Sequence, residues 1–132
     1  MKSSSFIILI LLFSVFPAIT SASGVIMHAK VSGVYCGIYN GADMCSIYFN
    51  KESVSAPSCV SSSYKLRMQL STKTETGRSM LSLAMTANAT GKTVIALGTG
   101  TCSIWSDTED LNSIFLPPKC AESNNTWGCL PS

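Results

Sequence analysis

The hydrophobic positions divide the chain into an N-terminal apolar run and a longer segment in which apolar and polar residues alternate. The run covers residues 6–16, follows Lys2 and three serines, and is followed by small residues that include Thr20 and Ala22. It is about half of the ~20 residues that a membrane-spanning helix needs. A short apolar core between a basic start and a small-residue site is typical of a secretory signal peptide. The pattern therefore predicts a signal peptide over residues 1–22, cleaved after Ala22.

The remaining residues, 23–132, contain no repeat, low-complexity tract or Pro/Gly-rich linker. They therefore predict a single domain.

Period-two alternation predicts strands over residues 25–31 and 64–70, and a β-rich run predicts another strand over 44–49. In residues 64–70, YKLRMQL, the pattern places Tyr64, Leu66, Met68 and Leu70 in the core and Lys65, Arg67 and Gln69 in solvent. In residues 25–31 it places His28 on the solvent side, with Ile26 and Lys30. The turn residues NGAD precede the run at 44–49, so the first two strands are expected to form a hairpin.

After residue 70 the apolar spacing changes from two to the helical pattern i, i+3, i+4, i+7. Thr74 or Thr76 is expected to cap the start of this amphipathic helix, with Glu75 in its first turn, and Gly91 is expected to end it. The apolar face of the helix consists of Met80, Leu83, Ala84 and Ala87.

Two further strands follow the helix. KTVIALG, residues 92–98, is expected to be a buried strand, and residues 111–116 supply the last one before Pro117 and Pro118 end it. Three strands, a helix and two more strands match a small five-stranded OB-type barrel, a mainly β (α+β) fold. A non-barrel α+β sandwich has the same element order and is the alternative.

The cysteine count favours a disulfide framework. Six cysteines lie beyond the predicted cleavage site, in a domain that would enter an oxidising compartment. A zinc site is disfavoured, because no pair has CxxC spacing and His28 is the only histidine. Six cysteines allow fifteen pairings, and spacing alone does not choose among them. The cysteines are Cys36, Cys45, Cys59, Cys102, Cys120 and Cys129.

Charge and catalytic chemistry narrow the function classes. Without Lys2, eight basic and seven acidic residues remain, a formal charge of about +1, and no basic run occurs. Nucleic acid is therefore not an expected partner.

No serine lies in a GxSxG motif, and paired cysteines cannot act as nucleophiles. We therefore expect neither an enzyme nor a cofactor, and no stable membrane insertion after cleavage.

The loop after Cys102 carries the candidate binding chemistry. Trp105 offers an aromatic face, and the polar residues after it can exchange hydrogen bonds with sugar hydroxyls. The opposing interpretation is that Trp105 is a core residue beside a disulfide, followed by a satisfied turn. The carboxylates of the loop could also surround Ca²⁺, but they lack an EF-hand pattern, so a turn cap is preferred to a metal site. The candidate glycan-binding residues are Trp105, Ser106, Asp107, Thr108 and Glu109.

Residues 77–116 resemble a group of small exported bacterial proteins with a similar helix, a GKxV strand and a GTGTCSxWxDTE loop. That group in turn resembles the OB-fold B subunits of AB-type toxins with five B subunits, of the heat-labile enterotoxin, subtilase-cytotoxin and pertussis-like classes. The enterotoxin order of a Cys-x-Trp step followed by an Asn-Ser-Ile strand is matched by CSIW at 102–105 and NSI at 112–114. The resemblance implies that Trp105 stacks on a sugar, that five copies form a ring, and that a separate A subunit exists.

The same resemblance implies a disulfide between Cys59 and Cys102, because the cysteine of a PSC step pairs with that of GTGTC in this group. Locality then favours the other two bridges, Cys36–Cys45 around the first hairpin turn and Cys120–Cys129 in a C-terminal loop.

Taken together, the sequence predicts a secreted or periplasmic, non-catalytic binding module that recognises a cell-surface glycan. The alternative is a stand-alone secreted or periplasmic structural or inhibitory protein whose partner is another protein.

Overall fold

A computed structural model describes residues 22–117, which form five strands, one α-helix and a short 3₁₀-helix. The helix lies between the third and fourth strands, as the sequence predicts. The mainly β fold with one helix is therefore confirmed. The elements are β1 (Val25–Tyr39), β2 (Ala42–Phe49), η1 (Ser62–Tyr64), β3 (Arg67–Ser71), α1 (Glu75–Thr90), β4 (Thr93–Gly98) and β5 (Leu111–Phe115).

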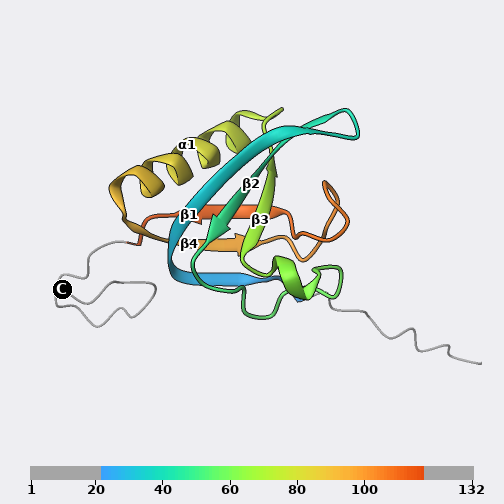
Figure 1. Cartoon of the computed structure of the whole chain (residues 1–132), viewed down its shortest axis with the longest axis horizontal. Helices are drawn as coiled ribbons and strands as arrows, with labels where there is room; N and C mark the ends of the chain where they lie inside the picture. The colour runs from blue at the N-terminus through green and yellow to red at the C-terminus, as the bar shows by residue number, and fades with distance from the viewer. Residues whose placement is uncertain (1–21, 118–132) are drawn as a thin grey trace, which may run out of the picture.

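The strands form one sheet in the order β3-β2-β1-β4-β5, with antiparallel neighbours. The long strand β1 pairs with β4 over its first half and with β2 over its second half, and it curves strongly between them (Figure 1). This curvature brings β3, at one edge of the sheet, close to the residues just before β5, at the other edge. Gln69 in β3 forms a parallel bridge with Asp110, just before β5, and its N–H donates to the Glu109 carbonyl at 2.9 Å.

The predicted first hairpin is present, and its turn explains its register. Asn40 and Gly41 both have positive φ, 47° and 75°. This conformation is that of a two-residue type I′ turn, which favours Asn-Gly because its twist matches that of the strands. Cys36 therefore lies opposite Cys45.

The alternation predicted for the start of β1 is wrong. Ile26 is fully buried, whereas Met27 is 43% exposed. The cause is a bulge: the β1–β4 register shifts between Ile26 and Ala29, and His28 in the bulge has φ 46°. An extra residue in one strand reverses which positions face the core.

The prediction for β3 is also wrong in two respects. The strand begins at Arg67, because Ser62–Tyr64 form η1 and the next two residues form a turn, which leaves Leu66, predicted for the core, 41% exposed. Arg67 and Gln69, predicted to face solvent, are 7% and 0% exposed. The second face of β3 is covered by the loop before β5, which hydrogen-bonds to both residues. Alternation predicts a solvent-facing side only where nothing packs on it.

Helix α1 follows its sequence signals closely. The Thr74 hydroxyl accepts a hydrogen bond from the Gly77 N–H at 3.0 Å, which makes Thr74 the N-cap, and Gly91 ends the helix with φ 66°. Ala84 and Ala87 are buried in the core, and the larger apolar side chains of the same face pack against it. The predicted helix and its termini are therefore confirmed.

Two of the three predicted disulfides fall in the described residues, and both are present. Cys36–Cys45 links β1 to β2 beside the hairpin turn, and Cys59–Cys102 links the loop before η1 to the loop after β4. The predicted Cys120–Cys129 bridge lies outside the described residues. No helix in residues 22–117 is long and apolar enough to span a membrane.

Candidate functional site

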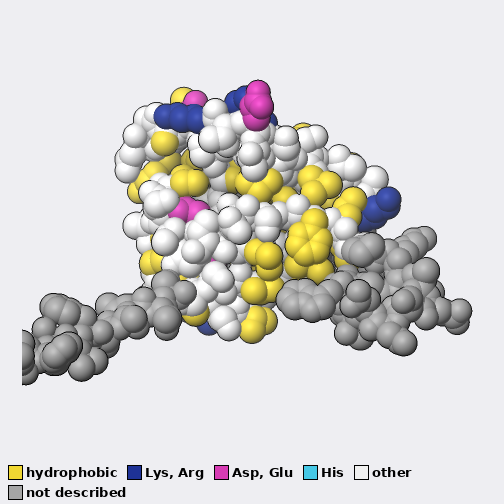
Figure 2. Space-filling view, turned by 180° about the vertical axis from the view of Figure 1, so that it is seen from behind, with side chains coloured by type: hydrophobic (Ala, Val, Ile, Leu, Met, Phe, Trp, Pro, Cys, Tyr) yellow, Lys and Arg dark blue, Asp and Glu magenta, His cyan; other side chains and the backbone are white. Residues whose placement is uncertain are grey.

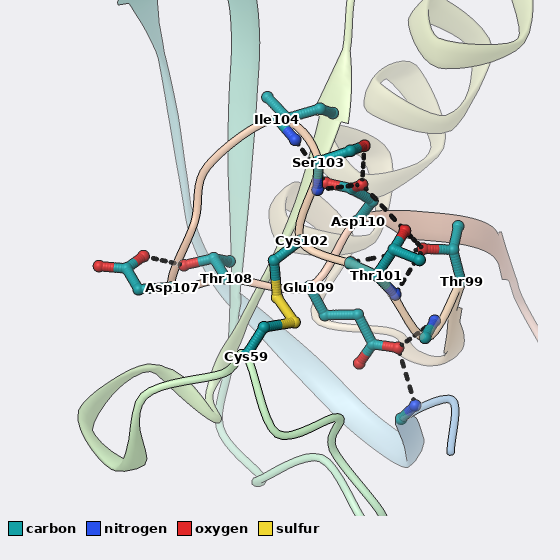
Figure 3. The surroundings of a disulfide bond; sticks show 12 residues. Cys59, Thr99, Thr101, Cys102, Ser103, Ile104, Asp107, Thr108, Glu109 and Asp110 are labelled. Carbon is teal, nitrogen blue, oxygen red and sulfur yellow. Dashed lines mark hydrogen bonds between the residues drawn. A yellow bond between two sulfur atoms is a disulfide. The ribbon is translucent and has the colours of Figure 1, made fainter. Parts of the chain in front are cut away.

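The loop between β4 and β5, residues 99–110, is organised by its own last residue (Figure 3). Asp110 accepts hydrogen bonds from the backbone N–H groups of Ser103 and Ile104, at 2.8 and 3.1 Å, and from the hydroxyls of Thr101 and Ser103. A carboxylate that accepts from successive backbone donors fixes a turn. Asp110 therefore caps the turn, the role that the sequence favours for the carboxylates of this loop.

The three carboxylates of the loop face different partners. Asp110 caps the turn, Asp107 pairs with Arg67, and Glu109 accepts hydrogen bonds from backbone N–H groups. Within residues 22–117 no three His, Cys, Asp or Glu side chains converge to hold a metal ion.

Arg67 is the buried cation around which the surface beside this loop is built. Its Nε donates to the Thr108 hydroxyl at 2.7 Å, and its Nη2 donates to Asp107 at 2.9 Å. Its Nη1 lies 3.5 Å from the Tyr48 hydroxyl. Hydrogen bonds to a guanidinium are stronger than neutral ones, so these contacts hold the side chain in one orientation.

Aromatic rings surround the same guanidinium. Its central carbon lies 3.6 Å from the Tyr64 ring centroid and 4.8 Å from that of Trp105. Trp105 is in turn stacked on Tyr39, with centroids 4.6 Å apart and planes at 13°. Rings attract a cation placed over their faces, so the rings and the guanidinium stabilise one another. We call this group the Arg67 cluster: Arg67, Tyr39, Tyr48, Tyr64, Trp105, Asp107 and Thr108.

A small pocket of about 190 Å³ opens beside the Arg67 cluster. It brings together side chains from β2, η1 and β3 with hydroxyl, aromatic and guanidinium chemistry. Its lining residues are Tyr48, Ser63, Tyr64, Leu66 and Arg67.

The five candidate residues predicted from sequence do not lie together. Trp105 and Asp107 belong to the Arg67 cluster, and Ser106 between them is exposed. Thr108 also belongs to the cluster and is fully buried, where its hydroxyl accepts from Arg67, whereas Glu109 is buried elsewhere, against the start of β1. Trp105 itself is half-buried, with its ring against Tyr39.

Sequence reasoning missed the residues that line the pocket. Alternation predicts only strand positions for Tyr64 and Arg67, and Tyr48 is predicted only as part of the β-rich run at 44–49. The available signal was the acidic loop at 107–110: a buried strand arginine needs a carboxylate, and this loop is rich in them.

His28, the one histidine of the sequence, lies in the β1 bulge. Its Nδ1 is buried without a hydrogen-bond partner.

No family model matches the chain, and a sequence search of curated proteins finds no match. The resemblance to toxin B subunits therefore stays a prediction. The case for function rests on the geometry of the Arg67 cluster and on the pocket beside it.

Proposed function

We propose that this protein is a secreted, non-catalytic binding module of the toxin B-subunit type, and that it recognises a cell-surface glycan in the pocket beside the Arg67 cluster. The observation that supports this most is Arg67 itself. Its side chain lines the pocket while ion-pair, hydroxyl and aromatic contacts hold its guanidinium in place.

The chemistry of the pocket suits a sugar. Tyr64 presents an aromatic ring, whose apolar face complements sugar C–H groups. The hydroxyls of Tyr48 and Ser63 can both donate and accept hydrogen bonds. The three hydrogen bonds of Arg67 use three of its five N–H donors, which leaves donor capacity for a ring hydroxyl or a sugar carboxylate.

In this proposal Trp105 and Asp107 orient Arg67 and support the pocket wall. Trp105 already contacts Tyr39 and Arg67, and neither Trp105 nor Asp107 lines the pocket. The sugar contact predicted for Trp105 therefore moves to Tyr64, a few ångströms from the same guanidinium.

The fold and the assembly that we propose for this protein come from the resemblance to toxin B subunits. We propose an OB-type barrel, supported by the sheet order and by the parallel bridge between Gln69 and Asp110 that joins the outer strands. Five copies would form a ring that carries a separate A subunit. Export is supported by the leader pattern and by two disulfides, which persist in oxidising compartments.

A glycan array with purified protein tests the binding, and a pair of matched variants tests its location. Ser63→Trp places an indole in the pocket, whereas Ser62→Trp adds the same ring to an exposed neighbour that does not line it. We expect binding to selected glycans by the unmodified protein and by Ser62→Trp, and at least a ~10-fold loss for Ser63→Trp.

The absence of binding to any glycan would refute recognition. Equal binding by the two variants would refute the location. Light scattering tests the ring separately: a mass of one chain at micromolar concentration would remove the assembly from the proposal.

A protein partner is the second candidate, because two large apolar side chains of β1 near the hairpin turn are exposed. Ile38 is 76% exposed and Tyr35 55% exposed. Ile38 also lines a hollow of about 360 Å³ together with Leu81 of α1. On the face seen in Figure 2, hydrophobic side chains spread across the middle while most charged ones lie near the edges. Ile38→Lys should then abolish association and leave glycan binding unchanged.

A further inference from the structure

Glu109 is a buried carboxylate, and one of its two oxygens has no hydrogen-bond partner. The residue is 1% exposed. Its Oε1 accepts hydrogen bonds from the Gly24 N–H at 2.9 Å and the Gly100 N–H at 2.8 Å. Its Oε2 is buried and has no hydrogen-bond partner. In Figure 3 two dashed lines meet at one oxygen of Glu109 and none reaches the other.

No cation compensates this carboxylate within residues 22–117. The ion pair found in this range joins Arg67 to Asp107, and no basic group lies within 4.0 Å of Glu109. A buried carboxylate is strongly destabilising unless it is paired with a positive charge or fully hydrogen-bonded. The position of Oε2 therefore indicates where a cation is needed.

That position is beside Gly24, at the start of the domain. A Cβ added to Gly24 would collide with Oε2 of Glu109 and with the Ser53 hydroxyl, which is likewise buried without a hydrogen-bond partner. Gly24 is also held in place, since its carbonyl accepts from the Gly98 N–H at 2.8 Å. Two unpartnered oxygens thus face a fixed backbone position one residue beyond Ser23.

We propose that the α-ammonium group created when the leader is removed after Ala22 forms an ion pair with Glu109. In the cleavage, a signal peptidase adds one water across the Ala22–Ser23 amide bond. The leader keeps the Ala22 carboxylate, and the Ser23 amine takes up a proton from solvent at neutral pH. Before cleavage the same nitrogen is a neutral peptide N–H.

The chain geometry allows this contact. Standard backbone bond lengths put the nitrogens of consecutive residues about 3–4 Å apart. Since the Gly24 nitrogen is 2.9 Å from Oε1, the Ser23 nitrogen starts within about 7 Å of the carboxylate. Ser23 is exposed, so rotation about its backbone bonds can bring the ammonium closer.

The consequence is that leader removal completes the fold. A precursor that still carries residues 1–22 lacks the ammonium and leaves Glu109 uncompensated, which lowers the stability of its folded state. The inference rests on the predicted cleavage and is independent of glycan binding, so a negative glycan array does not bear on it.

The test uses the full chain, expressed with its own leader in an exporting host, with the processed N-terminus determined by intact mass. One variant inserts Gly-Ser between Ser23 and Gly24, which keeps the residues at the cleavage site and moves the ammonium outward by about 7 Å. The second variant is Glu109→Gln, and the third combines both changes. Glu52→Gln, at an exposed acidic residue, is the matched control.

We expect a processed chain that begins at Ser23. The insertion should lower the thermal midpoint by at least ~5 °C when Glu109 is present and by less than ~2 °C when it is combined with Glu109→Gln. The α-amine should also react with an acylating reagent at least ~5-fold more slowly in the unmodified protein than in the insertion variant. Glu52→Gln should match the unmodified protein in both measurements.

A different processed N-terminus would overturn the inference, as would an insertion that has the same effect with and without the Glu109→Gln substitution. If Glu109→Gln does not fold, the acylation rates of the unmodified and insertion proteins decide the question. Equal rates would show that the amine is unpaired.

Discussion

Asp107→Ala tests whether the Arg67 cluster contributes to stability as a buried ion pair. Asp107 accepts from the Arg67 guanidinium at 2.9 Å and from the Thr108 hydroxyl at 2.9 Å. The substitution removes both bonds. It leaves Arg67, whose side chain is 7% exposed, without the carboxylate partner shown in the structure.

The expected loss of unfolding free energy lies between the values for a buried and for an exposed ion pair. Breaking a fully buried ion pair costs about 3–5 kcal/mol, and an exposed pair is worth about 1 kcal/mol or less. Arg67 is buried, but the Asp107 side chain is 34% exposed, so solvent screens part of the interaction. We therefore expect Asp107→Ala to lower the free energy of unfolding by about 2 kcal/mol, or the thermal midpoint by roughly 10 °C.

Urea unfolding measured by tyrosine and tryptophan fluorescence checks this value. Asp43→Ala is the control, because Asp43 is exposed in the hairpin; we expect it to change stability by less than ~0.5 kcal/mol. In an Arg67→Met background the Asp107→Ala loss should shrink below ~1 kcal/mol, since the cation is gone. If Asp107→Ala costs no more than Asp43→Ala, the ion pair is not the support that we infer.

Two further changes test the packing and the covalent links. Gly77→Ala should destabilise the fold by about 1–3 kcal/mol in urea unfolding, although alanine favours helices, because its Cβ would strike the backbone carbonyl of Ser71, the last residue of β3; a stabilised variant would contradict this packing. Replacing Cys59 and Cys102 by alanine should cost about 4 kcal/mol and replacing Cys36 and Cys45 about 2.6 kcal/mol, because the bridges close loops with sequence separations of 43 and 9. The reverse order of midpoints in calorimetry would show that strain or residual structure outweighs loop entropy.

The elements that sequence predicted correctly have local signals. The N-cap Thr74, the C-terminal Gly91 and the Asn40-Gly41 turn each impose a backbone conformation within a few residues, and the structure shows all three. Apolar periodicity located α1, and the short apolar run located β4. These signals do not depend on what the rest of the chain does.

The errors arise where distant segments decide the outcome. The bulge around His28 reverses the inward and outward positions at the start of β1, and no residue type there predicts it. Arg67 and Gln69 look like solvent-facing positions of β3 until the 99–110 loop covers them. Alternation of apolar and polar residues predicts a strand with one buried face, so it fails for a strand such as β3 that is buried on both faces.

The sequence singled out the GTGTCSIWSDTED loop as a ligand site, and the structure gives most of its residues a different task. Within the loop, Asp110 fixes the turn. Glu109 accepts a hydrogen bond from Gly24, at the start of the domain, and Asp107 pairs with Arg67 of β3. Cys102 anchors the loop to the segment before η1. A loop that joins the start of β1, the edge of β3 and β5 has little chemistry left for a ligand. Recognition is therefore better sought in the pocket that this loop supports, where Tyr64 of η1 and Arg67 of β3 meet.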